Sequence, residues 1–126
     1  MNIGITKGQA EAQITEAIVK FEREYMGRGP EESKTYIIED IVIIRLQGVL
    51  TPAEKQLSAA DSSVGRSLIK QVRRELLEKA RNLLEVIIQD VLRCEVRTMH
   101  TDISTTTGER VIIFTLGDIP KFKGNF

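Results

Sequence analysis

The stretch VGRSLIKQVRRELLEKARNLLEVIIQDV, residues Val64–Val91, decides the fold because it predicts one long helix with a wide apolar face. It contains no proline and one glycine, near its start, so nothing interrupts a helix of about 42 Å. Its apolar side chains fill a helical sector of about 160°, which is wider than a surface helix requires. A single helix of this kind is not stable in water, so it must cover a sheet or a partner.

The residues before this helix predict a second helix and a β-hairpin. A capping box begins at Thr6, and the apolar spacing after it predicts a helix over residues 6–26 that ends at a Gly-Arg-Gly-Pro turn. The run Tyr36–Leu46 is too β-branched for a helix and too long for one strand, so its polar Glu39-Asp40 pair marks a hairpin turn. Both faces of this hairpin are apolar, and we therefore expect both to be covered.

A short helix and a second hairpin complete the chain. The segment Thr51–Glu54 has the hydroxyl, proline and carboxylate of a strong helix start, for a helix that ends near Ala60. The segment Asp61–Ser63 then offers an N-cap for the long helix. The segments Cys94–Ile103 and Arg110–Leu116 predict two strands, and the glycine-containing residues between them predict the loop of a hairpin.

The resulting order, αββ-α-αββ, predicts an α+β fold. It implies one antiparallel four-stranded sheet with the two long helices packed on one face. We expect a single domain over residues 1–117, followed by a loosely held tail over residues 118–126. The two αββ halves match in kind, which is consistent with an internal duplication, although no residue-level identity supports one.

The composition restricts the kinds of partner that the chain can have. Its 126 residues carry 18 Lys and Arg against 18 Asp and Glu, so no overall field attracts nucleic acid or an anionic membrane. One Cys and one His do not form a zinc site without several carboxylates, and no cofactor motif is present. No apolar run approaches the ~20 residues of a membrane span, and the N-terminal residues lack the apolar core of a signal peptide. We therefore expect a cytoplasmic protein without metal, cofactor or membrane insertion.

Three stretches resemble the MpsC family of small bacterial proteins: GRGPEES at Gly27–Ser33, RLQGVLTPAEKQL at Arg45–Leu57 and HTDISTTTGERVIIFTL at His100–Leu116. The resemblance departs at Cys94, where we expect glycine, and this leaves the tight turn before the third strand in question. The family takes its name from a proposed sodium-translocating, membrane-potential-generating system. The resemblance implies a soluble cytoplasmic protein associated with an ion or bicarbonate transport system, and it implies no catalysis.

The first candidate binding site is basic. Arg66, Lys70 and Arg73 project within about 30–60° of one another on the long helix. They predict a site for an acidic partner or a small anion, assisted by the helix N-terminus. Arg28 of the Gly-Arg-Gly-Pro turn is a candidate addition to this site. The competing interpretation is a solvated rim paired with glutamates of the first helix.

The second candidate site is polar. His100 and Asp102 lie two residues apart on a predicted strand, hence on one side and about 6.6 Å apart, where a carboxylate can orient an imidazole. Cys94 lies about 20 Å from His100 along the same strand, which excludes a nucleophile–base pair between them. The competing interpretation is a structural or interfacial role for both residues. We expect no enzyme.

These patterns predict a non-catalytic accessory or regulatory interaction protein, associated with a subunit of a membrane ion or bicarbonate transport system. The alternative is a sensor of a small anion or nucleotide that uses Arg28, Arg66, Lys70 and Arg73. The long helix and the two-sided hairpin offer more apolar surface than one chain can bury, so we expect a homodimer. We expect no nucleic-acid partner, because two Tyr and four Phe offer little surface on which bases can stack.

Overall fold

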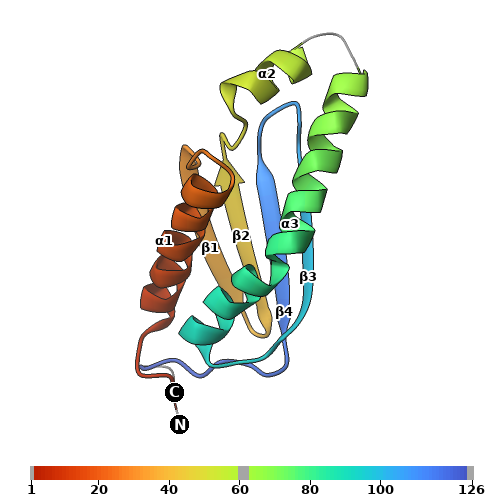
Figure 1. The fold of residues 1–126 in the computed structure, drawn as a ribbon. Coiled ribbons are helices and arrows are strands. Elements are labelled where there is room, and N and C mark those ends of the chain that lie inside the picture. The colour runs from red at the N-terminus through yellow and green to blue at the C-terminus, as the bar shows by residue number, and fades with distance from the viewer. Residues whose placement is uncertain (1, 60–62, 125–126) are drawn as a thin grey trace.

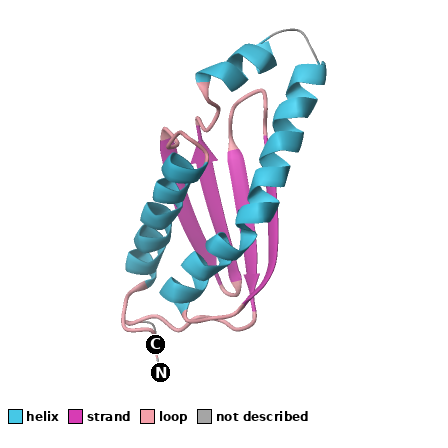
Figure 2. Ribbon diagram, viewed as in Figure 1, coloured by secondary structure: helices cyan, strands magenta, loops and turns pink. Residues whose placement is uncertain are grey.

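A computed structural model of the chain describes residues 2–59 and 63–124, which form three helices and four strands (Figures 1 and 2). The predicted order αββ-α-αββ is confirmed. The elements are α1 (Lys7–Tyr25), β1 (Glu32–Ile38), β2 (Ile41–Gln47), α2 (Pro52–Ala59), α3 (Ser63–Leu92), β3 (Val96–Ile103) and β4 (Arg110–Leu116).

The strands form one antiparallel sheet in the order β1-β2-β4-β3. Each hairpin supplies two neighbouring strands, and the pairing of β2 with β4 joins the two halves of the chain at the centre of the sheet. Ile43 pairs with Ile113 in the middle of this contact. Helices α1 and α3 both lie on the same face of the sheet (Figure 1). The predicted α+β fold with two long helices on one face is therefore confirmed.

The core fills the space between these helices and the inner face of the sheet, which is the face that they cover. On the sheet, alternate residues point inward, so Ile44 and Phe114 are fully buried. On α1 and α3, the buried positions recur at a spacing of three or four residues. The helical core residues include Ala10, Ile14 and Ile18 of α1, and Ile69, Leu77, Ala80, Leu84 and Ile88 of α3.

Both predicted capping boxes are present. At α1 the Gln9 amide N–H donates to Oγ1 of Thr6 at 3.1 Å, and the Thr6 amide N–H donates to Oε1 of Gln9 at 2.9 Å. At α2 the Glu54 amide N–H donates to Oγ1 of Thr51 at 3.2 Å, and the Thr51 amide N–H donates to Oε1 of Glu54 at 2.9 Å. Each box satisfies amide groups that the first turn of a helix leaves unpaired. The N-cap predicted at residues 61–62 and the helix end at Ala60 lie outside the described residues.

Two residues with a left-handed backbone conformation form the turn between β1 and β2 and the turn between α3 and β3. Glu39 has φ 53° at the turn between β1 and β2, where the polar pair marked the hairpin. Arg93 has φ 57° directly after α3, so the chain turns toward β3 without glycine at position 94. The departure from the family pattern at Cys94 therefore does not remove the turn.

Both edge strands of the sheet carry a local feature that hinders the addition of a further strand. On β1, the amide N–H of Ile37 donates to Oε2 of Glu11 of α1 at 2.9 Å, so this side chain occupies a donor of the free edge. On β3, the register with β4 shifts between Val96 and Thr98, as in a β-bulge.

The expectation of a loosely held tail is wrong for residues 118–124. The amide N–H of Ile3 donates to the carbonyl of Lys121 at 2.9 Å, and the amide N–H of Lys123 donates to the carbonyl of Ile5 at 2.8 Å. Phe122 is buried in the core, with 5% of its surface exposed. The segment is ordered because it pairs with the N-terminal residues and places an aromatic ring under them. Asn125 and Phe126 lie outside the described residues.

Candidate functional site

Four charged side chains from four elements meet beneath α3, and we call them the buried charge cluster: Glu22, Glu54, Arg73 and Arg110. Arg73 makes a bidentate pair with Glu54, in which Nε donates to Oε2 at 2.8 Å and Nη2 donates to Oε1 at 2.6 Å. Nη2 also donates to the carbonyl of Val49 at 2.9 Å. The Arg73 side chain is only 2% exposed. It therefore joins α3 to α2 and to the loop before α2.

Arg110 and Glu22 are less completely paired. The Arg110 Nε atom lies 3.8 Å from Oε1 of Glu22, and Nη1 of Arg110 donates to Oγ1 of Thr101 at 2.9 Å. Among the described residues, neither oxygen of Glu22 accepts a hydrogen bond, and Nη1 of Arg73 and both Nε and Nη2 of Arg110 donate none. Unpaired buried polar atoms are uncommon and unfavourable, so the cluster has hydrogen-bonding capacity that the described residues do not use.

Burial shifts the pKa values of the cluster in different directions. Burial raises the pKa of Glu22, against the attraction of Arg110 and Arg73. Burial lowers the pKa of Arg110 to about 10, against the attraction of Glu22, so this guanidinium still carries its charge at neutral pH. For Glu54, burial acts to raise the pKa, but the hydrogen bonds from Arg73 and Thr51 outweigh it and the pKa is lowered. Glu54 is therefore the permanent counter-charge of the cluster.

A small cavity of about 50 Å³ adjoins the cluster at the edge of the sheet, and we call it the edge cavity. Arg73 and Arg110 line it from inside the protein, and Lys70 and Arg74 approach it from α3. Lys70 Nζ lies 3.5 Å from Oδ1 of Asp102, in a solvent-exposed ion pair. The remaining lining residues are Leu77, Thr101, Asp102 and Ile103.

The structure brings together two of the four predicted basic residues. Lys70 and Arg73 share the edge cavity, but Arg73 is buried, so the expectation that it belongs to a solvated rim is wrong. Arg66 is half-buried on the first turns of α3 and does not line this cavity. Arg28 lies apart from the edge cavity: its Nε donates to the carbonyl of Gly48 at 3.2 Å, and its Nη2 donates to Glu31 at 3.1 Å.

Sequence reasoning missed Arg74 and Arg110 as members of the site. Arg110 begins a strand in which alternate residues, Ile112 and Phe114, are buried. The period of two therefore places its guanidinium on the inner face, next to α3. Alternation in the sequence was a usable signal for Arg110, whereas exposed Arg74 carries no such signal.

His100 and Asp102 share one side of β3 and are both exposed, as the strand period predicted. They do not form a carboxylate–imidazole pair: Asp102 accepts from the amide N–H of Ile103 at 2.8 Å and lies near Lys70. The pKa of Asp102 is lowered first by this amide and then by Lys70, against burial. Within the described part of the chain, the His100 side chain makes no hydrogen bond and no ion pair.

The outer face of the sheet, which points away from α1 and α3, carries an apolar patch. Tyr36 pairs with Ile43 across β1 and β2, and Ile43 pairs with Ile113 across β2 and β4. These side chains are exposed or half-buried, so no element among the described residues covers this face, and the expectation that both faces of the hairpin are covered is not met within the chain. The outer patch consists of Tyr36, Ile38, Ile41, Ile43, Val111 and Ile113.

A second apolar surface runs along α3, on a flank of the helix beside its buried line. Val72, Leu83 and Val86 are 53%, 56% and 50% exposed, and Leu76 is half-buried beside them. Their spacing of four, seven and three residues follows the 3–4 repeat of helices that pack against another helix. Lys79 occupies the one remaining position of this repeat. We call these four apolar residues and Lys79 the α3 seam.

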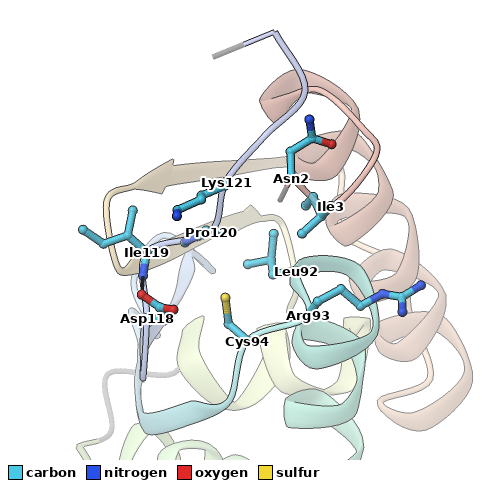
Figure 3. Close-up of a pocket in the computed structure, with 9 residues that line it drawn as sticks. All are labelled: Asn2, Ile3, Leu92, Arg93, Cys94, Asp118, Ile119, Pro120 and Lys121. Atoms are coloured by element: carbon cyan, nitrogen blue, oxygen red, sulfur yellow. Dashed lines mark hydrogen bonds between the residues drawn. The ribbon is translucent and has the colours of Figure 1, made fainter. Parts of the chain in front are cut away.

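A further hollow lies where the N-terminal residues meet the C-terminal segment. Its volume is about 450 Å³, and Figure 3 shows Leu92, Cys94 and Pro120 around it. Burial raises the pKa of the Cys94 thiol, and the charge of Asp118 raises it further. The thiol is therefore not activated as a nucleophile.

The described residues offer no group of three or more His, Cys, Asp and Glu side chains that could hold a metal ion. Across residues 2–59 and 63–124, no helix is both long enough and apolar enough to cross a bilayer.

Comparison with known proteins identifies one family and one similar protein. Residues 6–118 match the family described as "Na+-translocating membrane potential-generating system (MpsC)". The chain is also similar to the uncharacterized protein YbcI of Bacillus subtilis (strain 168), with 41% identity over 111 residues, which is 88% of each chain. No solved structure matches the chain at a significant level.

Proposed function

This chain belongs to the MpsC family, and we propose that it is a non-catalytic accessory protein of a membrane ion-transport system that acts as a homodimer in the cytoplasm. The outer patch is the single observation that carries this proposal. A two-layer protein normally alternates apolar inner residues with polar outer ones. Here six apolar side chains lie together on the outer face, and such patches mark interaction sites.

The charges around the outer patch favour a second copy of the same chain as its occupant. Lys34, Arg45, Val111 and Asp102 form one row across the sheet, from edge to edge. A two-fold axis parallel to the strands, between β2 and β4, exchanges the two edges of facing sheets. It places Lys34 over Asp102 of the partner subunit and Ile43 over Ile113 of the partner subunit. Opposite charges then meet at the edges and isoleucines meet at the centre, while Arg45, which pairs with Glu109, faces Val111 of the partner subunit.

The size of the outer face sets the expected strength of this dimer. From strand spacing and rise, a face of four strands and seven residues measures roughly 19 by 23 Å. Two such faces bury on the order of 1,000 Å² in total, near the lower limit for a specific interface. We therefore expect a dimer that dissociates on dilution into folded monomers.

The α3 seam remains outside this dimer and supplies the contact to the transport system. Antiparallel pairing of two copies of the seam about its middle brings Lys79 near its own symmetry mate, and the two like charges repel. The seam therefore fits an apolar helix of another protein that carries an acidic residue opposite Lys79. A cytoplasmic helix of a membrane subunit is the occupant that we propose.

Light scattering tests the dimer, and membrane potential tests the association. At micromolar concentration we expect a species of twice the 14.2 kDa chain mass; a single 14.2 kDa species up to the highest soluble concentration overturns the dimer. In cells that lack the chain, a potential-sensitive dye should report a smaller sodium-dependent membrane potential. The wild-type chain should restore it, and Val86→Asp in the α3 seam should not, although this variant stays dimeric. An unchanged potential in cells that lack the chain overturns the transport assignment.

A further inference from the structure

The edge cavity lies against donors that the protein itself does not use. Among the described residues, Nη1 of Arg73 and Nη2 of Arg110 have no hydrogen-bond acceptor, although each arginine is only 2% exposed. Both side chains line the cavity. Thr101 adds a third donor, because its Oγ1 accepts from Arg110 and its hydroxyl hydrogen remains free to donate. Side chains with unused donor capacity therefore line this small space from three elements.

The charge around the cavity favours an anion. Four cationic side chains, Lys70, Arg73, Arg74 and Arg110, line it. They face three carboxylates at most, namely Glu22, Glu54 and Asp102. Inside the protein Arg73 and Arg110 are matched by Glu22 and Glu54. The excess of one positive charge therefore lies at the mouth, where Lys70 and Arg74 outnumber Asp102. An anion bound in the cavity gives the unpaired guanidinium donors their acceptors.

The size of the cavity limits the class of anion. A water-sized group needs about 10–15 Å³ of such space, so about 50 Å³ holds three or four of them. This matches the oxygen atoms of one phosphate, sulfate or bicarbonate ion, and it is too small for a nucleotide. Lys70 and Asp102 form the mouth, and their side chains are 43% and 80% exposed, so an ion can enter from solvent.

We propose that the edge cavity is a binding site for one small oxyanion, held by the guanidinium groups of Arg73 and Arg110 and by the Thr101 hydroxyl. Lys70 and Arg74 attract the ion at the mouth. The pair Arg73–Glu54 positions one guanidinium and also joins α3 to α2, so the bound ion stabilises the packing of these helices. The two guanidinium groups lie on the inner side of the sheet, opposite the outer patch, whereas Asp102 belongs both to the mouth of this site and to the proposed dimer contact.

Thermal unfolding with defined anions tests the proposal. Phosphate, sulfate and bicarbonate are each added at 10 mM, with sodium chloride at equal ionic strength as the reference. We expect at least one of the three to raise Tm by roughly 3–10 °C above the reference. In nuclear magnetic resonance spectra, the side-chain Nε–H signals of Arg73 and Arg110 should shift with the same ion. No rise above the chloride reference with any of the three ions overturns the site.

Variants at the mouth locate the effect without disturbing the core. Lys70→Gln with Arg74→Gln removes two charges at the cavity and should weaken the ion's Kd by about tenfold or more. Lys20→Gln with Lys55→Gln removes two exposed charges elsewhere and is the matched control, for which we expect an unchanged Kd. Equal affinity in both double variants, with no shift of the Arg110 signal, shows that the ion binds elsewhere and overturns the assignment.

Discussion

The Glu22 carboxylate lies 3.8 Å from the Arg110 guanidinium, and almost no part of either side chain reaches solvent. Burial raises the pKa of Glu22 in spite of this partner. A carboxyl group whose pKa is higher in the folded chain binds its proton more tightly when folded. Its contribution to stability is therefore fully present below its unfolded pKa, near 4.5, and is lost as pH rises through the folded pKa.

Glu22→Gln should remove this pH dependence. We expect the free energy of unfolding of the wild type to fall relative to that of the variant as pH rises from about 4.5 to 8. Urea unfolding of both proteins at several pH values measures the difference. Glu24→Gln, at an exposed position of α1, is the control and should follow the wild type. A constant difference between wild type and Glu22→Gln over this range contradicts the prediction.

The Arg73–Glu54 pair should behave as a buried pair. Glu54→Ala leaves the Arg73 charge without its partner, and we expect a loss of about 3–5 kcal/mol in the free energy of unfolding. Combining it with Arg73→Met should restore part of this loss, which a double-mutant cycle measures. The partly exposed Arg81–Glu85 pair is the comparison, and Arg81→Ala should cost no more than about 0.5 kcal/mol. If Glu54→Ala lowers the free energy of unfolding by as little as Arg81→Ala does, the Arg73 guanidinium is not isolated from solvent.

Neighbouring isoleucines of β2 should respond in opposite ways to the same change. Ile44 is fully buried on the inner face, so Ile44→Asp places a charge in the core and should prevent folding. Ile43 lies on the outer face, so Ile43→Asp should leave the monomer folded and abolish the dimer. Circular dichroism reports the fold, and light scattering reports the mass. A dimeric Ile43→Asp variant places the interface elsewhere.

The Cys94 thiol should react slowly. Because burial raises its pKa, the reactive thiolate is scarce near neutral pH. We expect a disulfide reagent at pH 8 to modify the folded chain about tenfold more slowly than a small-molecule thiol, and to modify it rapidly in urea. Equal rates with and without urea would mean that the thiol is freely accessible.

Removal of metal ions should leave the chain unchanged. The single His and single Cys motivate this expectation, since a structural metal would otherwise stabilise the fold. Tm measured with and without a chelator should agree within error. A decrease of several degrees that zinc reverses reveals a site built mainly from carboxylates.

Local patterns predicted the elements, whereas contacts between distant segments decided the site. The capping boxes at Thr6 and Thr51 depend on residues within one turn, and both are present. The strand order is different: each hairpin fixes its own two strands, but the β2–β4 contact depends on how the halves pack. Local patterns carry no signal for that contact. They also did not predict that Phe122 is buried, because its segment pairs with residues at the other end of the chain.

Arg73 illustrates why the site was only partly predictable. It falls four residues before buried Leu77 and four after buried Ile69, so periodicity alone places it on the inner line of α3. Its charge favoured exposure instead. The conflict is resolved by acceptors on Glu54 and Val49, which come from another segment and whose proximity the linear sequence does not reveal.

The altered edge strands limit how far these molecules can assemble. An unprotected edge strand can pair with the edge strand of another molecule, and repetition of this pairing produces filaments. Here Glu11 occupies the Ile37 amide on one edge, and the irregular register near Val96 interrupts the other. The outer face of the sheet remains available for contact. In the proposed dimer each copy covers the outer face of the other, so this face is no longer free. We therefore expect assembly through this face to stop at a closed pair instead of growing into a fibre.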